Sequence, residues 1–182
     1  LAGRVGIVEL GTFKANELFE QPLSLFYEFL EKKLTHKTLV QIKQLNATCT
    51  HKQMKTHFLK GGYPDASLSK DQFHFDQWMD NYYTTYINRD IRSLFPKLDL
   101  VKFQRFIGVL SNLSGQMINK SKIATIIEVD DKTVKDYLDI VHGSFIWRSI
   151  RSYEKSRSKS IVKMPKGGFR DSGLLHYQKN IR

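Results

Sequence analysis

Basic side chains that can bind phosphate groups gather toward the C-terminal end of the chain. The chain of 182 residues has a formal net charge of +11, and residues 142–182 carry +8. Arginine suits this chemistry because its planar guanidinium donates two parallel hydrogen bonds to a phosphate group. A charge excess confined to one segment indicates a polyanionic partner, here DNA or RNA. The predicted contacts are Arg148, Arg151, Lys155, Arg157, Lys159 and Lys163.

A helix predicted to follow Asp130 supplies three more candidates for nucleic-acid contact: Lys132, Thr133 and Lys135. The same helix carries four aspartates, which leave it at a net charge of −2 and repel phosphate: Asp130, Asp131, Asp136 and Asp139. Helix capping accounts for Asp130 and the helix dipole for Asp131, but neither accounts for the other two. The basic segment after this helix is therefore the better candidate surface. The alternative is a helix that packs against a protein partner or within the chain.

Other chemistry finds little support. Cys49, His51 and His57 are of metal-ligand type, but no fourth ligand or paired spacing accompanies them, so no metal site is predicted. No Ser/His/Asp or Cys/His set is recognisable. A single cysteine excludes an internal disulfide framework. No stretch approaches the roughly 18 apolar residues of a membrane span, so we expect a soluble cytoplasmic protein with no membrane partner.

The elements that must position these residues are mainly helical. A buried strand is expected at 4–10, a helix at 13–34 with Asn16 as its cap, and a helix at 50–60 ended by two glycines. The helix expected at 73–95 carries an aromatic stripe of Phe75, Trp78, Tyr82 and Tyr86, which indicates core more than a base-stacking surface. A second lysine block at 32–60, net +7, is compatible with a solvated surface.

The segment 99–164 has the pattern of a winged helix-turn-helix. Three helices are expected, capped by Asp99, Asn119 and Asp130, and the last two are separated by a short turn with apolar Val129. A strand at 145–151 follows, then a polar basic tip, and apolar character resumes at Ile161-Val162. These features predict a hairpin with a basic tip. The fold class is therefore mainly α with a small β-hairpin, a helical lid followed by a winged helix-turn-helix.

Several stretches occur in the order found in one family. They are Leu1-Ala2-Gly3-Arg4 before the strand 5–10, Phe58-Leu59-Lys60-Gly61-Gly62-Tyr63-Pro64-Asp65, Trp78 through Ile91, Thr133-Val134-Lys135, and Phe169-Arg170-Asp171-Ser172-Gly173-Leu174-Leu175. Together they resemble the predicted prokaryotic AAA+ ATPases that carry the C-terminal domain of unknown function 4143. The resemblance implies an ATPase core, a helical lid, a winged helix and a domain like restriction endonucleases.

The resemblance also implies that this chain is the middle of a longer protein. It would divide the chain into the last strand of an ATPase core (1–12), a helical lid (13–72), a connector with the winged helix (73–164) and the start of a truncated C-terminal domain (165–182). ATP and Mg²⁺ are implied for the full-length family. No Gly-rich loop ending in Lys-Ser/Thr occurs here, so this chain alone is expected to be inactive as an ATPase.

Arg4 and Arg89-Asp90 match positions of the family, and each has both a functional and a structural interpretation. Arg4 matches the place of the arginine that reaches a neighbouring subunit's γ-phosphate in AAA+ proteins, which implies a homo-oligomer formed through the ATPase core. The alternative is a structural arginine at a strand start. Arg89-Asp90 matches a recurrent family dipeptide, and it can equally bridge the lid and the winged helix.

Overall fold

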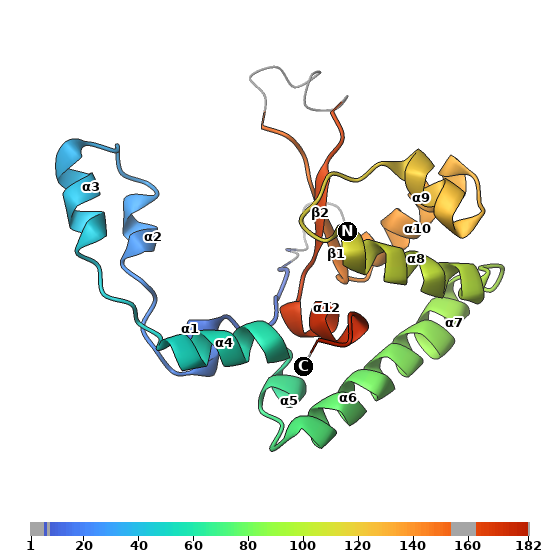
Figure 1. The fold of residues 1–182 in the computed structure, drawn as a ribbon, viewed down its shortest axis with the longest axis horizontal. Coiled ribbons are helices and arrows are strands. Elements are labelled where there is room, and N and C mark those ends of the chain that lie inside the picture. The colour runs from blue at the N-terminus through green and yellow to red at the C-terminus, as the bar shows by residue number, and fades with distance from the viewer. Residues whose placement is uncertain (1–5, 7, 154–162, 182) are drawn as a thin grey trace.

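The computed structural model describes residues 6, 8–153 and 163–181 and is mainly helical, with one pair of antiparallel strands near the C-terminal end (Figure 1). This confirms the expected fold class at that level. The N-terminal helices are α1 (Ala15–Leu18), α2 (Phe26–Phe29), α3 (His36–Lys43), α4 (His51–Lys60) and α5 (Pro64–Ser67). The remaining elements are α6 (Gln72–Thr85), the π-helical segment η1 (Tyr86–Ile91), α7 (Arg92–Leu94), α8 (Leu100–Leu113), α9 (Lys120–Ile127), α10 (Asp131–Gly143), β1 (Trp147–Ile150), β2 (Lys166–Phe169) and α12 (Ser172–Gln178).

The N-terminal expectations were wrong in two places. Among the described residues of the expected strand, Gly6 and 8–10 form no strand, and Val8 and Leu10 are 89% and 93% exposed. The described residues offer this segment no neighbouring strand to pair with. The helix expected at 13–34 is two separate short helices, α1 and α2, because the backbone turns at Glu20, whose φ is +51°. Lys14, not Asn16, is the N-cap of α1.

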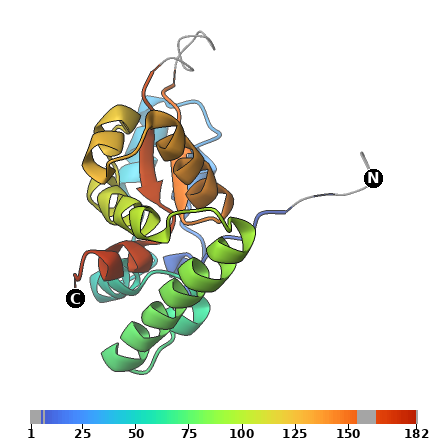
Figure 2. The same cartoon turned by 90° about the vertical axis from the view of Figure 1, so that its right-hand side faces the viewer.

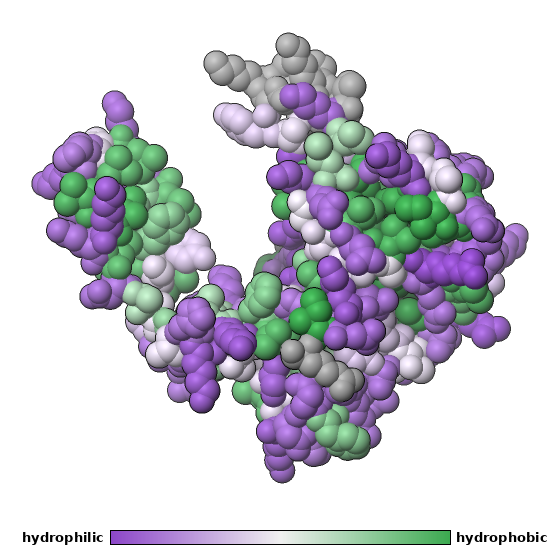
Figure 3. All heavy atoms as spheres, in the orientation of Figure 1, coloured by the Kyte–Doolittle hydropathy of each residue, from purple (hydrophilic) through white to green (hydrophobic). Residues whose placement is uncertain are grey.

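Helices α2 and α3 pack against each other and form an arm that extends away from the rest of the molecule (Figure 1). We call residues 20–46 the arm. Many of its apolar side chains are exposed, and Figure 3 shows them gathered over the arm, apart from the body. They include Leu23, Leu25, Phe26, Leu30, Leu34 and Leu39.

The long helical segment begins at Asp71 and continues through α6, η1 and α7 to Leu94, as the aromatic stripe predicted. Of this stripe, Phe75 and Tyr86 are buried, and Trp78 and Tyr82 are partly buried against the core. The π-helical segment inserts a wider turn near the end of the helix, a feature that sequence periodicity does not indicate.

Helices α8, α9 and α10 begin at the three caps that the sequence indicated. The side chains of Asp99, Asn119 and Asp130 each accept a hydrogen bond from a backbone N–H in the first turn of the helix that follows. Glu128 has a left-handed backbone in the turn between α9 and α10, with φ of +57°. The three helices bury one continuous core, with Phe103, Phe106, Ile123, Ile127, Val134 and Tyr137 in its interior.

The strand pair follows α10 directly. Trp147 lies opposite Phe169 and Arg148 opposite Gly168, and the register continues to Ile150 opposite Lys166. The second strand is therefore 166–169, whereas the expected second strand at 161–162 lies outside the described residues. The strands pack against α8 and α10, so they lie among these helices in Figure 2. Met117, between α8 and α9, forms an isolated bridge to Lys166.

Helices α4 and α12 meet at a close junction built on glycines. Asp171 is buried and accepts hydrogen bonds from the backbone N–H groups of Gly62 at 2.8 Å and Leu174 at 3.0 Å. A Cβ atom on Gly61 would collide with the Asp171 carboxylate, and one on Gly173 would collide with the carbonyl of Lys60. Two stretches that carry the family resemblance, Lys60-Gly61-Gly62 and Asp171-Ser172-Gly173, are thus in direct contact. They were only separate patterns in the sequence.

Candidate nucleic-acid interface

One face of the strand pair carries three basic side chains. Side chains alternate between the two faces of a strand, and residues directly opposite each other share a face. Arg148 lies opposite Gly168, so Lys166 and Arg170, two residues to either side of that glycine, lie diagonally beside Arg148 on the same face. Trp147 occupies the other face, where it is fully buried. We call Arg148, Lys166 and Arg170 the basic strand face.

Lys166 and Arg170 were not among the predicted contacts. Their alternate spacing with Gly168 is the signal in the sequence, but the neighbouring glycines weaken a strand pattern, and the family resemblance places residues 165–182 at the start of another domain. The backbone N–H of Arg170 donates to the carbonyl of Ile146 at 3.0 Å and extends the ladder past β2. The strand pair, and not the residue types alone, therefore brings these side chains beside Arg148.

Arg170 is held more firmly than the other two. Its side chain is 17% exposed, and its guanidinium carbon lies 4.9 Å from the ring centroid of Phe145, a cation–π distance. Phe145 has a φ of +63°, which is rare for a bulky side chain and marks a locally strained backbone. This conformation turns the chain from α10 into β1 and accompanies the placement of the phenyl ring against Arg170.

Glu9 bridges the two arginines of the basic strand face. Its Oε1 accepts a hydrogen bond from Arg148 Nη2 at 2.7 Å and forms an ion pair with Arg170. The hydrogen bond from Arg170 is the main cause that lowers the pKa of Glu9 below its ordinary value, so Glu9 is a carboxylate at neutral pH. Arg148 and Arg170 also line a cavity of about 1220 Å³, together with Lys14 and His57.

The three predicted contacts on α10 lie in a less favourable setting. Lys132 and Lys135 are exposed, but Asp136 and Asp139 follow them at four-residue steps and so lie one turn away on the same sides of the helix. Thr133 is half-buried, and its backbone N–H donates to Asp130 at 2.6 Å. The carboxylates offset the positive charge that these lysines can offer to phosphate.

The unexplained aspartates of α10 face a groove. Asp136 and Asp139 line a cavity of about 1210 Å³ between α10 and the end of the long helix, with Leu94, Phe95 and Ile140 on its walls. Asp131, in contrast, accepts a hydrogen bond from the hydroxyl of Ser121 at 2.5 Å and ties α9 to α10. The acidic face of α10 therefore borders an apolar groove.

The other predicted contacts divide between two regions. Arg151 and Lys163 are exposed on either side of the segment that joins the two strands. Lys155, Arg157 and Lys159 lie outside the described residues, and so does Arg4. Arg89 and Asp90 are in η1, where Arg89 Nε donates to Asp90 at 2.9 Å, so the salt bridge that the structure shows joins the two to each other.

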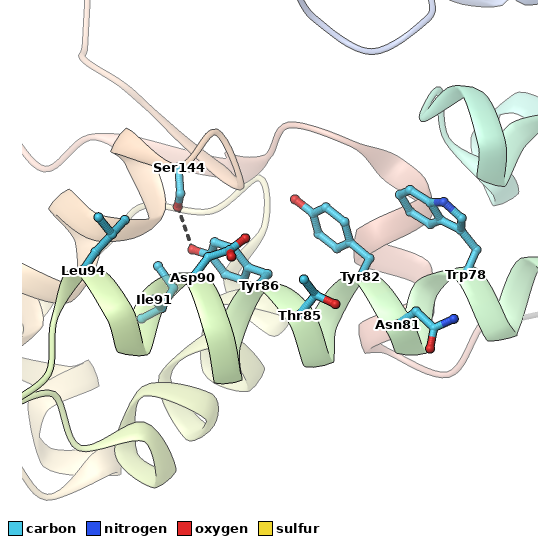
Figure 4. A pocket seen from close by; sticks show the side chains of 9 residues that line it. All are labelled: Trp78, Asn81, Tyr82, Thr85, Tyr86, Asp90, Ile91, Leu94 and Ser144. Carbon is cyan, nitrogen blue, oxygen red and sulfur yellow. Dashed lines mark hydrogen bonds between the residues drawn. The ribbon is translucent and has the colours of Figure 1, made fainter.

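Trp78, Tyr82 and Tyr86 of the aromatic stripe line a third surface pocket, of about 480 Å³ (Figure 4). Trp78, Tyr82 and Tyr86 stack in a row along the long helix, with ring centroids 5.2 and 6.1 Å apart. The Tyr86 hydroxyl pairs with Ser144 Oγ at 2.6 Å, and burial raises the pKa of Tyr86 to about 12. The pocket lies between the long helix and the end of α10. Because the three rings stack on each other, less of their surface is left for a nucleic-acid base to stack on.

In the part of the chain that the structure describes, no group of three His, Cys, Asp or Glu side chains is placed to hold a metal ion. Within the same residues, no helix has the length and apolarity to cross a membrane.

This chain is similar to two curated proteins, the uncharacterized protein Rv2008c of Mycobacterium tuberculosis and the uncharacterized protein Mb2031c of Mycobacterium bovis. Each is 27% identical over 119 residues, which is 65% of this chain but 27% of the relative's own length. The chain thus spans about a quarter of each relative. No solved structure matches it. Residues 51–182, from α4 through the strand pair to α12, match a domain of unknown function (DUF8612), and the chain belongs to that family.

Proposed function

We propose that this chain is the non-catalytic, C-terminal part of an AAA+ ATP-binding protein and that a winged helix with a basic strand pair binds nucleic acid. The order α8, Met117, α9, α10, β1 and β2 supports the winged-helix assignment, since helix-turn-helix modules of this type combine three helices with a small antiparallel sheet. The helices α1 to α5 correspond in this proposal to the lid.

The basic strand face carries the nucleic-acid part of the proposal. Arg148, Lys166 and Arg170 lie side by side on one surface, and arginine at such a surface pairs with phosphate through its guanidinium fork. Exposed Arg151 and Lys163 continue the positive charge toward the strand connection. Phosphate contacts of this kind stabilise binding to DNA and RNA and do not depend on the base sequence.

The test compares two double variants that remove the same charge. Arg151→Ala/Lys166→Ala removes two cations at the strand pair, whereas Lys37→Ala/Lys43→Ala removes two from α3. We expect the 182-residue chain to bind a fluorescein-labelled 20-base-pair DNA duplex, with affinity that falls as salt rises. The strand variant should reduce the slope of log K against log salt by about 1.8, because each phosphate contact contributes about 0.9.

The α3 variant is the control, and its slope should remain that of the wild type. Fluorescence anisotropy from 50 to 200 mM NaCl measures both. Failure of the wild type to bind DNA or RNA duplexes at 50 mM NaCl would reject the nucleic-acid function. Equal losses in the two variants would show that only the net charge matters and that the strand face is not the surface.

The ATPase part of the proposal concerns the longer protein. This chain has no Gly-rich loop ending in Lys-Ser/Thr, so its residues do not fit the phosphates of ATP, and no ATP chemistry is assigned to them. The reading frame upstream of Leu1 should encode such a loop. Arg4→Ala in the full-length oligomer should slow ATP hydrolysis, and unchanged hydrolysis would contradict the proposed role of Arg4.

A second candidate function rests on the groove beside α10. Apolar residues form much of its walls, and it is lined both by carboxylates (Asp136, Asp139) and by amines (Lys97, Lys102), a mixture that favours a protein segment over phosphate. In this alternative the winged helix is a protein-binding or intramolecular packing module. Asp136→Lys/Asp139→Lys tests where α10 lies: it should strengthen duplex binding if α10 approaches nucleic acid, and leave it unchanged if α10 is turned toward a protein partner instead.

A further inference from the structure

The two arginines of the basic strand face converge on a single oxygen of one carboxylate. Arg148 and Arg170 both contact Oε1 of Glu9, which comes from a part of the chain 139 and 161 residues away in sequence. Two guanidinium groups around one oxygen are an arrangement that also suits the oxygen of a phosphodiester, because carboxylate and phosphate accept the same charge-assisted hydrogen bonds.

The cationic half of this contact is built into the fold. Arg170 is largely buried, lies against the ring of Phe145 and stands at the end of the β ladder. Arg148 is fixed at its base by the register of β1 with β2. These constraints come from the strand pair and α10, not from Glu9. The two guanidinium groups therefore have supports that do not depend on their present partner.

The anionic half is attached differently. Glu9 lies in a stretch without secondary structure, and its flanking residues Val8 and Leu10 are almost fully exposed. The Glu9 side chain is 44% exposed, so its ion pairs are in contact with solvent. An ion pair with a carboxylate exposed to this degree contributes little free energy, so an anion from solution can replace Glu9 at small cost. The carboxylate is therefore a replaceable occupant of a preformed cationic site.

We propose that Arg148 and Arg170 form a binding site for a nucleic-acid phosphodiester and that Glu9 occupies this site in the free protein as an internal competitor. This inference rests on the proposed nucleic-acid function and adds the phosphate site and its regulation. Binding of a strand displaces Glu9, and the phosphate takes the hydrogen bonds that the carboxylate leaves. Lys166, diagonal to Arg148 on the opposite side, is placed to contact the neighbouring phosphate.

The competition predicts a gain of affinity when Glu9 loses its charge. Glu9→Gln should bind the labelled 20-base-pair DNA duplex about two- to fivefold more tightly than the wild type, the factor that corresponds to an exposed ion pair. Glu17→Gln is the matched control, since it removes one negative charge from the same part of the chain at a residue that caps α1. That control should change the affinity little. Anisotropy titrations of the 182-residue chain at 50 and 150 mM NaCl measure all three proteins.

A further variant tests whether the gain depends on the arginines. Adding Arg170→Ala to Glu9→Gln should abolish the gain in affinity. If circular dichroism shows that this double variant is misfolded, the double variant Glu9→Gln/Arg148→Ala is used in its place. If the wild type, Glu9→Gln and Glu17→Gln all fail to bind the duplex at 50 mM NaCl, the proposed nucleic-acid function is wrong. If the wild type binds and Glu9→Gln equals Glu17→Gln, that function stands and the internal competitor is wrong.

Discussion

At the scale of single residues, glycines set the distances of closest approach in this molecule. Gly167 lies over the indole of buried Trp147, and a Cβ atom there would collide with the ring. Gly61 and Gly173 do the same at the junction of α4 with α12. The sequence indicates Gly61 as a helix-end signal and marks neither Gly167 nor Gly173 in that way. It could not show what lies opposite them, because the opposing residues are far away in the chain.

The collision at Gly167 predicts that a larger residue there lowers the stability of the fold. Gly167→Ala should lower the free energy of unfolding by about 1–3 kcal/mol, because overpacking against Trp147 forces the strand or the ring to move. Gly108→Ala makes the same chemical change inside α8, where only the end of Gln178 lies near, at 3.9 Å. That control should raise stability by about 0.5–1 kcal/mol, since alanine favours helix. Urea unfolding measures both, and equal midpoints for Gly167→Ala and wild type would contradict the argument.

At the scale of elements, helix starts were predictable and helix partners were not. The caps at Asp99, Asn119 and Asp130 are local signals, since each side chain bonds to a backbone N–H two or three residues later. The helix expected at 13–34 failed because its apolar periodicity did not reveal the turn at Glu20. The strand at 166–169 was missed because glycines weaken the strand signal, and only its pairing with β1 defines it.

The cap of α10 has a pH dependence that can be measured. Hydrogen bonds from the Thr133 backbone lower the pKa of Asp130, so the folded state holds this proton less tightly than the unfolded state, where the pKa is about 3.9. The stabilisation is therefore full above the ordinary aspartate pKa and is lost as pH falls through the lower folded value. Asp130→Asn still caps the helix but does not titrate. The melting temperature of wild type relative to this variant should be highest at pH 7 and should fall between pH 5 and pH 3. Parallel curves would contradict the role of Asp130.

At the scale of the whole molecule, the body and the arm differ in how they are held together. The core lies in α5, the long helix, α8 to α10, the strands and α12, and includes no residue of the arm. The family match begins at residue 51, close to the start of α4. The net charge of +11 is likewise uneven, since the lysine block coats α3 and α4 while the arginine-bearing block forms the strand face. The sequence already locates the two blocks, and the fold adds which elements carry them.

This difference predicts the order of proteolysis. Limited chymotrypsin digestion should cut first at exposed aromatic residues of the arm such as Phe26 and Tyr27, because local opening there disrupts few buried contacts. Phe103, Phe106 and Tyr137 should resist cleavage, since they are buried in the core. Mass spectrometry of early fragments identifies the sites. Cleavage in α8 or α10 as fast as in the arm would contradict this division.

The hydrogen bond between Gly62 and Asp171 also bears on how the chain folds during synthesis. These residues are 109 positions apart in the sequence. The N–H group of Gly62 therefore has its hydrogen-bond acceptor only after residue 171 has been synthesised. A ribosome releases the N-terminal residues first, and contacts of such long sequence separation form late. Helices α8 to α10, whose contacts are between neighbours in sequence, can assemble before α12 exists. We therefore expect the docking of α12 onto α4 to be the last step, the one that converts a set of locally formed helices into the native molecule.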